Sequence, residues 1–144
     1  MESEPPVLER LIFKHHQQPF YLIADAWDGK FIKEATSVFL RAAARNGQRP
    51  IHLDGHVIGS GGNAGMLAYI GHDGLMDFSL EGSFSNADGR QRDAIILACY
   101  SKAYFEPYLQ QANARAWVWT TGLMAPEAYT LHDALAGYVQ GRRL

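Results

Sequence analysis

Two short apolar runs, each bounded by polar or glycine-rich sequence, constrain the fold of this chain more than any other feature. The first run, residues 66–70, leads to His72 after one glycine. The second, residues 94–98, leads directly to Cys99, the only cysteine in the chain. Runs this short and apolar are typical of strands buried in a parallel sheet, whose carboxyl ends meet at one edge. We therefore expect His72 and Cys99 to lie close together.

Strand-like and helical segments alternate along the rest of the chain. This order predicts an α/β fold, a three-layer α/β/α sandwich with a mostly parallel sheet. We expect an N-terminal extension at residues 1–19 and a single domain at residues 20–144. The other predicted strands are residues 20–24, 51–58 (a strand or a hairpin arm) and 116–120, and the predicted helices are residues 30–46, one after Cys99, and one from Pro126 to residue 141.

Proline and glycine limit these elements. Pro107 belongs in the first turn of a helix, so the helix after Cys99 is expected to begin near Phe105. The glycine-rich residues 59–65 are expected to form a loop. The loop begins like a dinucleotide fingerprint but leads into a strand instead of a helix, so a loop or lid bordering the functional edge is the better interpretation.

The overall composition is typical of a globular domain and excludes several classes of protein. The 144 residues are 47% hydrophobic and 12% aromatic, which excludes a disordered chain or a coiled coil. A net charge of -2 argues against nucleic acid or an anionic membrane surface as the main partner. No signal peptide or membrane helix is visible, and a single cysteine makes no internal disulfide, so the expected location is the cytoplasm. No metal-ligand spacing occurs, and we expect no metal and no organic cofactor.

A thiol beside an imidazole is the minimal pair for nucleophilic catalysis. A free cysteine is more commonly a small buried hydrophobe, but Cys99 ends its strand, where free amides of a following helix start would favour a thiolate. The backbone amide of Cys99, with that of Asp73 or Gly74, would form an oxyanion hole. Either Asp73 or Asp77 would orient the ring of His72. The sequence leaves that choice open.

The two segments resemble the caspase, gingipain and legumain group of cysteine peptidases, and its bacterial members in particular. The resemblance rests on residues 68–74, where an apolar strand ends in His, and residues 95–101, where another ends in Ala-Cys. It implies a caspase-like fold, Cys99 as nucleophile, His72 as acid and base, and a peptide or protein as substrate. This chain differs in having Asp73 between His72 and the glycine, and a His-to-Cys separation below the roughly 50 residues of caspases.

Residues at the ends of neighbouring strands would build the substrate pocket. Asp25 follows the first predicted strand, and Thr120 and Thr121 follow the last. Asp25 in that pocket would prefer a basic side chain before the cleaved bond, but capping statistics favour Asp25 or Asp28 as the cap of the first helix. Two other functions stay open: a catalytically inactive caspase-like interaction module, and a flavodoxin-like ligand-binding domain that uses residues 59–65.

Overall fold

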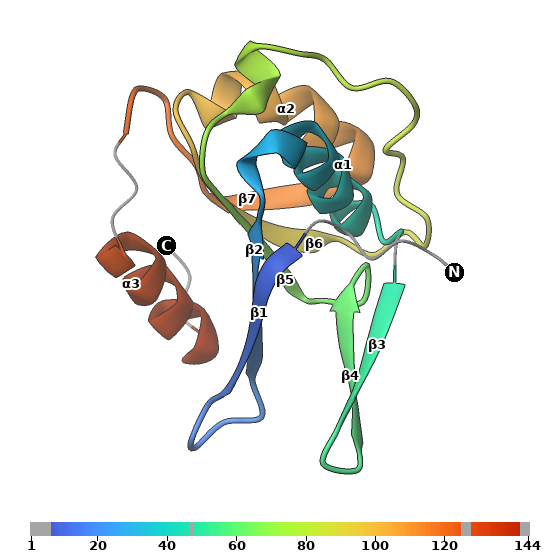
Figure 1. Cartoon of the computed structure of the whole chain (residues 1–144), viewed down its shortest axis with the longest axis vertical. Helices are drawn as coiled ribbons and strands as arrows, with labels where there is room; N and C mark the ends of the chain where they lie inside the picture. Colours follow the sequence, from blue (N-terminus) through green and yellow to red (C-terminus); the bar gives the residue numbers. More distant parts are fainter. Residues whose placement is uncertain (1–6, 47, 125–127, 142–144) are drawn as a thin grey trace.

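The structure is a computed structural model that describes residues 7–46, 48–124 and 128–141 (Figure 1). The elements follow one another along the chain as β1 (Val7–Lys14), β2 (Tyr21–Trp27), the 3-10 turn η1 (Gly29–Phe31), α1 (Ile32–Ala43), β3 (Gln48–Leu53), β4 (His56–Gly61), β5 (Met66–Ile70), the 3-10 turn η2 (Gly74–Met76), β6 (Arg92–Leu97), α2 (Ser101–Ala112), β7 (Ala114–Val118) and α3 (Ala128–Val139).

Three strands form a parallel sheet in the order β5–β6–β7, with β6 in the middle. β5 pairs with β6 from Met66 opposite Asp93 to Ile70 opposite Leu97. The side chains of β6 from Ala94 to Leu97 are all buried, which is typical of a central strand covered on both faces. The predicted parallel pairing of the two apolar runs is therefore confirmed.

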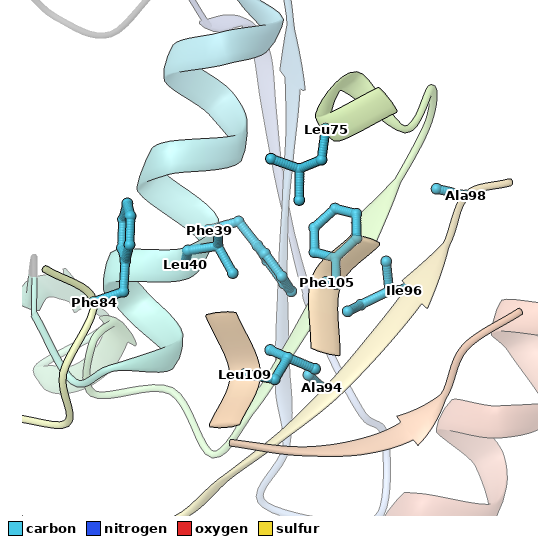
Figure 2. Packing of buried hydrophobic residues seen from close by; sticks show 9 residues of the cluster. All are labelled: Phe39, Leu40, Leu75, Phe84, Ala94, Ile96, Ala98, Phe105 and Leu109. Atoms are coloured by element: carbon cyan, nitrogen blue, oxygen red, sulfur yellow. The ribbon is translucent and has the colours of Figure 1, made fainter. Parts of the chain in front are cut away.

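Helices lie on both faces of this sheet. On one face, Ala94 and Ile96 of β6 pack with side chains of α1 and α2, among them Phe105 (Figure 2). On the opposite face, Ile95 and Leu97 pack in a second cluster that includes residues of α3. Figure 1 shows α1 and α2 above the sheet and α3 below it. The α/β class predicted from the sequence is confirmed.

Antiparallel hairpins account for four of the described strands. Residues 20–24 were expected in the main sheet, but they fall in β2, which pairs with β1. Residues 51–58 include the turn between β3 and β4, where Asp54 and Gly55 have positive φ angles of 49° and 77°. Asp-Gly favours this type I′ geometry. The predicted boundary between residues 1–19 and residues 20–144 lies between the two arms of the β1–β2 hairpin.

The glycine-rich residues 59–65 do not form one loop, which corrects the prediction. Residues 59–61 complete β4, and the chain turns only after them. A Cβ on Gly62 would lie 2.5 Å from the carbonyl oxygen of Asn46, so this backbone packs directly against the end of α1. The buried side chain of Arg92 also donates from Nη2 to the Gly62 carbonyl. The segment therefore joins the hairpin to the helix.

The helix after Cys99 begins at Ser101, earlier than predicted, and Pro107 lies inside it. An interior proline costs about 3 kcal/mol relative to alanine. Phe105 and Leu109 are both buried on the same helix, and each contributes about 1.5–3 kcal/mol. This burial offsets the proline, whose own side chain is exposed. Pro126, predicted to open the last helix, lies outside the described residues.

Candidate functional site

His72 and Cys99 leave the parallel sheet at the same edge. The amide of Gly71 donates to the carbonyl of Leu97 over 3.2 Å, which extends the pairing of β5 and β6 one residue past the end of β5. Neighbouring strands lie about 4.8 Å apart. His72 and Cys99 each follow two residues after the last paired position, Ile70 opposite Leu97. The imidazole is exposed, and the cysteine is half-buried.

The thiol of Cys99 contacts the backbone of Met124. Its Sγ lies 3.5 Å from the Met124 carbonyl oxygen, to which it donates, and accepts from the Met124 amide over 3.4 Å. Within the described part of the chain, no hydrogen bond joins this thiol to the ring of His72. The resting structure therefore holds the thiol against the segment that follows β7.

The imidazole of His72 is paired with Asp77. Its Nε2 lies 2.7 Å from Asp77 Oδ2, with both side chains largely exposed. In the neutral ring this contact assigns the proton to Nε2 and leaves the lone pair on Nδ1. Asp77, and not Asp73, is therefore the carboxylate that orients the ring.

Asp73 forms no hydrogen bond with the ring of His72 among the described residues and plays a structural role instead, because its side chain is fully buried. Its Oδ1 accepts from the amide of Leu75 over 3.1 Å and so caps the turn η2, whereas its Oδ2 has no hydrogen-bond partner in the described structure. Burial raises the pKa of this carboxyl, despite that hydrogen bond and the nearby His72. Figure 2 shows Leu75 reaching from η2 toward Phe105 in the core. Leu75 in the core and the cap at Asp73 therefore hold the turn that leads to Asp77.

Two of the three amides predicted to form an oxyanion hole lack an acceptor among the described residues, namely those of Asp73 and Cys99. The third amide, that of Gly74, is occupied, because it donates to the carbonyl of His72 over 3.0 Å. Gly74 is needed for packing instead. A Cβ there would lie 2.6 Å from the ring of Phe78.

The connection from β6 to α2 passes through Tyr100, whose φ of 51° and ψ of 34° are left-handed. This conformation costs a bulky residue roughly 1–2 kcal/mol and turns the chain sharply beside Cys99. The amides at the start of α2 are not free, contrary to expectation. Tyr100 donates to Gly122 and Lys102 to the carbonyl of Thr120, each over 2.9 Å. Occupied amides offer no hydrogen bond to a thiolate.

Thr120 serves this connection and not a substrate pocket. Its hydroxyl donates to the carbonyl of Ala98, and it accepts from the amide of Ser101 over 3.2 Å. The amide of Thr120 in turn donates to the Ser101 hydroxyl over 2.8 Å. Thr121, in contrast, is exposed at the same edge. Only Thr121 therefore keeps the position predicted for a substrate contact.

Asp25 is also engaged elsewhere. It accepts two hydrogen bonds from the guanidinium of Arg10, over 2.6 and 2.8 Å, across the β1–β2 hairpin. Its charge is already matched there, which removes the support for an acidic pocket. Of the two aspartates, Asp25 and Asp28, only Asp28 acts as a cap. Its side chain accepts from the amide of Lys30 over 3.0 Å at the start of η1.

Two residues that the sequence did not single out shape the site. The Tyr69 hydroxyl donates to the carbonyl of His72 over 2.7 Å, and burial raises the pKa of this phenol. Its ring lies 5.5 Å from that of Phe105 and ties the end of β5 to the core. The second is Met124, which contacts the Cys99 thiol although it lies 25 residues later in the sequence. Neither residue carries a local sequence signal for these contacts.

Other kinds of site have little support. Among the described residues, no group of three or more His, Cys, Asp or Glu side chains could hold a metal ion. None of the described helices is long and apolar enough to cross a membrane. A hollow of about 560 Å³ lies between residues 14–21 and residues 56–58, away from the predicted site residues. Comparisons of the chain with protein-family models, with curated proteins and with solved structures gave no match.

Proposed function

We propose that this chain is a thiol-dependent amide hydrolase, a peptidase with a caspase-like fold, in which Cys99 is the nucleophile and His72 the acid and base. The observation that carries the proposal is the parallel pairing of β5 with β6, since both reactive residues follow from it at one edge. Helices on both faces of the sheet and a sharp strand-to-helix turn beside Cys99 give further support. Such turns expose nucleophiles in other hydrolases.

In the acylation step, the Cys99 sulfur attacks the carbonyl carbon of the scissile amide, and the thiol proton passes to His72. A sulfur–carbon bond forms. When the carbon–nitrogen bond breaks, His72 gives that proton to the departing amine. Nδ1 is the nitrogen that exchanges the proton, because Nε2 is bound to Asp77.

In the second step, water attacks the thioester and releases a carboxylic acid, and His72 returns a proton to the sulfur. Both steps pass through a tetrahedral intermediate with a negatively charged oxygen. The amides of Asp73 and Cys99 are the donors suited to this oxygen, as neither is bonded to an acceptor in the described structure.

The contact between Cys99 and Met124 has to open during this reaction. A substrate carbonyl carbon must approach within about 3–3.5 Å of the sulfur, where the Met124 backbone now lies. A weak thiol hydrogen bond opposes this movement little, and Gly122 within the segment tolerates a change in backbone angles.

The test is hydrolysis of a peptide library made by digesting a whole-cell protein extract with trypsin and blocking the amines. The full chain and its Cys99→Ala and His72→Ala variants are incubated with the library, and new amino termini are identified by mass spectrometry. We expect cleavages with the parent that both variants lack, while their circular dichroism spectra match that of the parent. A parent indistinguishable from Cys99→Ala would contradict the proposal.

One observation favours a second candidate, a caspase-like domain retained for protein interaction without catalysis. At rest the thiol is bound to the Met124 backbone and the imidazole to Asp77, and the described structure has no hydrogen bond between the two. The library assay separates the candidates, because only an enzyme yields cleavages that depend on Cys99 and His72. The flavodoxin-like alternative has lost its main support, since residues 59–61 belong to β4.

A further inference from the structure

We infer that the peptide taken by Cys99 carries apolar side chains beside the scissile bond. This inference rests on the proposed function and adds the chemical class of its substrate. It differs from the basic preference that an acidic pocket at Asp25 would give, because Asp25 is neutralised by Arg10.

Large hydrophobic side chains are exposed around the two reactive residues. Ile70, two residues before His72, is 47% exposed, and Met76, in the turn that leads to Asp77, is 42% exposed. Tyr100, directly after Cys99, is 38% exposed, and Leu123 is 77% exposed. Each of these four side chains therefore offers apolar surface to a ligand held at the two reactive residues.

Hydrogen bonds bring the segments that carry these four residues to the same edge of the sheet. The bond from Gly71 to Leu97 sets the end of β5, with Ile70, beside the strand that leads to Cys99. The bond from Tyr100 to Gly122 sets Leu123 next to the start of α2. Met76 lies in η2, whose far end is held to His72 through Asp77. The apolar rim, defined as Ile70, Met76, Tyr100 and Leu123, therefore comes from the segments that lead to or follow His72 and Cys99.

Both carboxylates of the turn beside His72 are already engaged. Asp77 is bound to His72, Asp73 is buried, and the Lys102 ammonium lies 6.0 Å from the centre of the Trp119 ring. Binding sites that combine apolar walls with a few polar groups select ligands by burial of apolar surface. An apolar side chain of the substrate gains by leaving water against the rim, whereas a charged one would lose water without gaining a partner.

The experiment compares chloromethyl ketones of acetyl-leucine, acetyl-phenylalanine, acetyl-arginine and acetyl-aspartate. In each reaction the Cys99 sulfur displaces chloride, a sulfur–carbon bond forms, and the mass of the intact chain reports labelling at its single cysteine. Rates are divided by those of free cysteine to remove differences in reagent reactivity. We expect the leucine and phenylalanine reagents to label at least tenfold faster than the arginine and aspartate reagents, and His72→Ala to slow all four.

The rim itself is tested with Leu123→Ser, for which Leu8→Ser is the matched control. Leu8 is 72% exposed on the β1–β2 hairpin, outside the rim. We expect Leu123→Ser to lower the ratio of apolar to charged labelling severalfold and Leu8→Ser to leave it unchanged. Labelling that depends on His72 but favours arginine or aspartate, or shows no preference, overturns the inference alone. Labelling that is absent or independent of His72 overturns the proposed function and this inference with it.

Discussion

At the scale of single residues, the environment of His72 is the most developed part of the site. Its carbonyl accepts from both Tyr69 and Gly74, so its backbone is fixed from two directions. Its ring is fixed by Asp77, which belongs to the same short segment. A residue held at the backbone and at one ring nitrogen presents the other nitrogen in a constant direction. This is what a proton-transfer group requires.

Asp77 acts through His72, so its removal should weaken the reactivity of Cys99. An exposed ion pair of this kind contributes at most about 1 kcal/mol, equal to a factor of roughly five. We expect Asp77→Ala to slow iodoacetamide alkylation of Cys99 about three- to fivefold across pH 6 to 9, and Asp77→Glu to restore the rate.

The matched control for Asp77→Ala is Asp133→Ala, which removes the exposed partner of His132 on α3 and should change nothing at Cys99. In a His72→Ala background, Asp77→Ala should have no further effect, because the positioning acts only through that ring. An additional loss of rate in the double variant would show that Asp77 does not work through His72.

Asp73 predicts a pH dependence of stability. Burial holds its folded-state pKa above the ordinary 3.8, so the folded state binds a proton more tightly than the unfolded state. The contribution of Asp73 to the free energy of unfolding is therefore greatest below about pH 4, and it falls as the pH rises through the raised pKa. Asp73→Asn keeps the oxygen that caps η2 and removes the buried charge.

We expect Asp73→Asn to raise the free energy of unfolding by roughly 1 kcal/mol at pH 7, because the amide brings no charge into the buried site. The gain should shrink toward pH 4, where the parent carboxyl is also protonated. Urea denaturation of both proteins at pH 4, 5.5 and 7 measures the difference. A gain that is constant over this range, or a loss at pH 7, would be inconsistent with a buried, desolvated carboxylate.

At the scale of elements, the junction between β4 and α1 sets the entry into β5. Gly62 lies so close to the carbonyl groups of Asn46 and Arg45 that a Cβ there would clash with them. Arg92, from β6, donates a hydrogen bond to the Gly62 carbonyl. Any side chain at residue 62 would separate the hairpin from the helix. The strand that carries His72 begins four residues after this junction, so its position depends on the same contact.

We expect Gly62→Ala to destabilise the fold by about 1–3 kcal/mol, because the added methyl group meets backbone atoms that cannot rotate away. Gly29→Ala is the control, since a Cβ there has no neighbour within 4 Å. The midpoint of urea denaturation, followed by tryptophan fluorescence, reports both variants. Equal midpoints for Gly62→Ala and the parent would show that the junction is not closely packed.

At the scale of the whole molecule, the sequence predicts the central pairing and misses much around it. The apolar runs that end at His72 and Cys99 carry a strong local signal for parallel strands, and the structure pairs them in register. The β1–β2 hairpin was missed because β1, although it contains Leu, Ile and Phe, lies within the predicted N-terminal extension, and β2 looks like a core strand. The contact between Cys99 and Met124 has no local signal, as it joins loops 25 residues apart. Asp77 was one of two options, and only the path of η2 decides between them.

The central claim is that Cys99 and His72 act as a pair, and the most direct test is the rate of Cys99 alkylation by iodoacetamide at pH 7. The chain holds one cysteine, so the mass gained by the intact protein beyond that gained by Cys99→Ala reports the reaction. We expect the folded protein to react several times faster than the same protein in urea, and His72→Ala to slow the folded protein about tenfold. A thiol that reacts only after unfolding, or a rate that His72→Ala leaves unchanged, would contradict the pair.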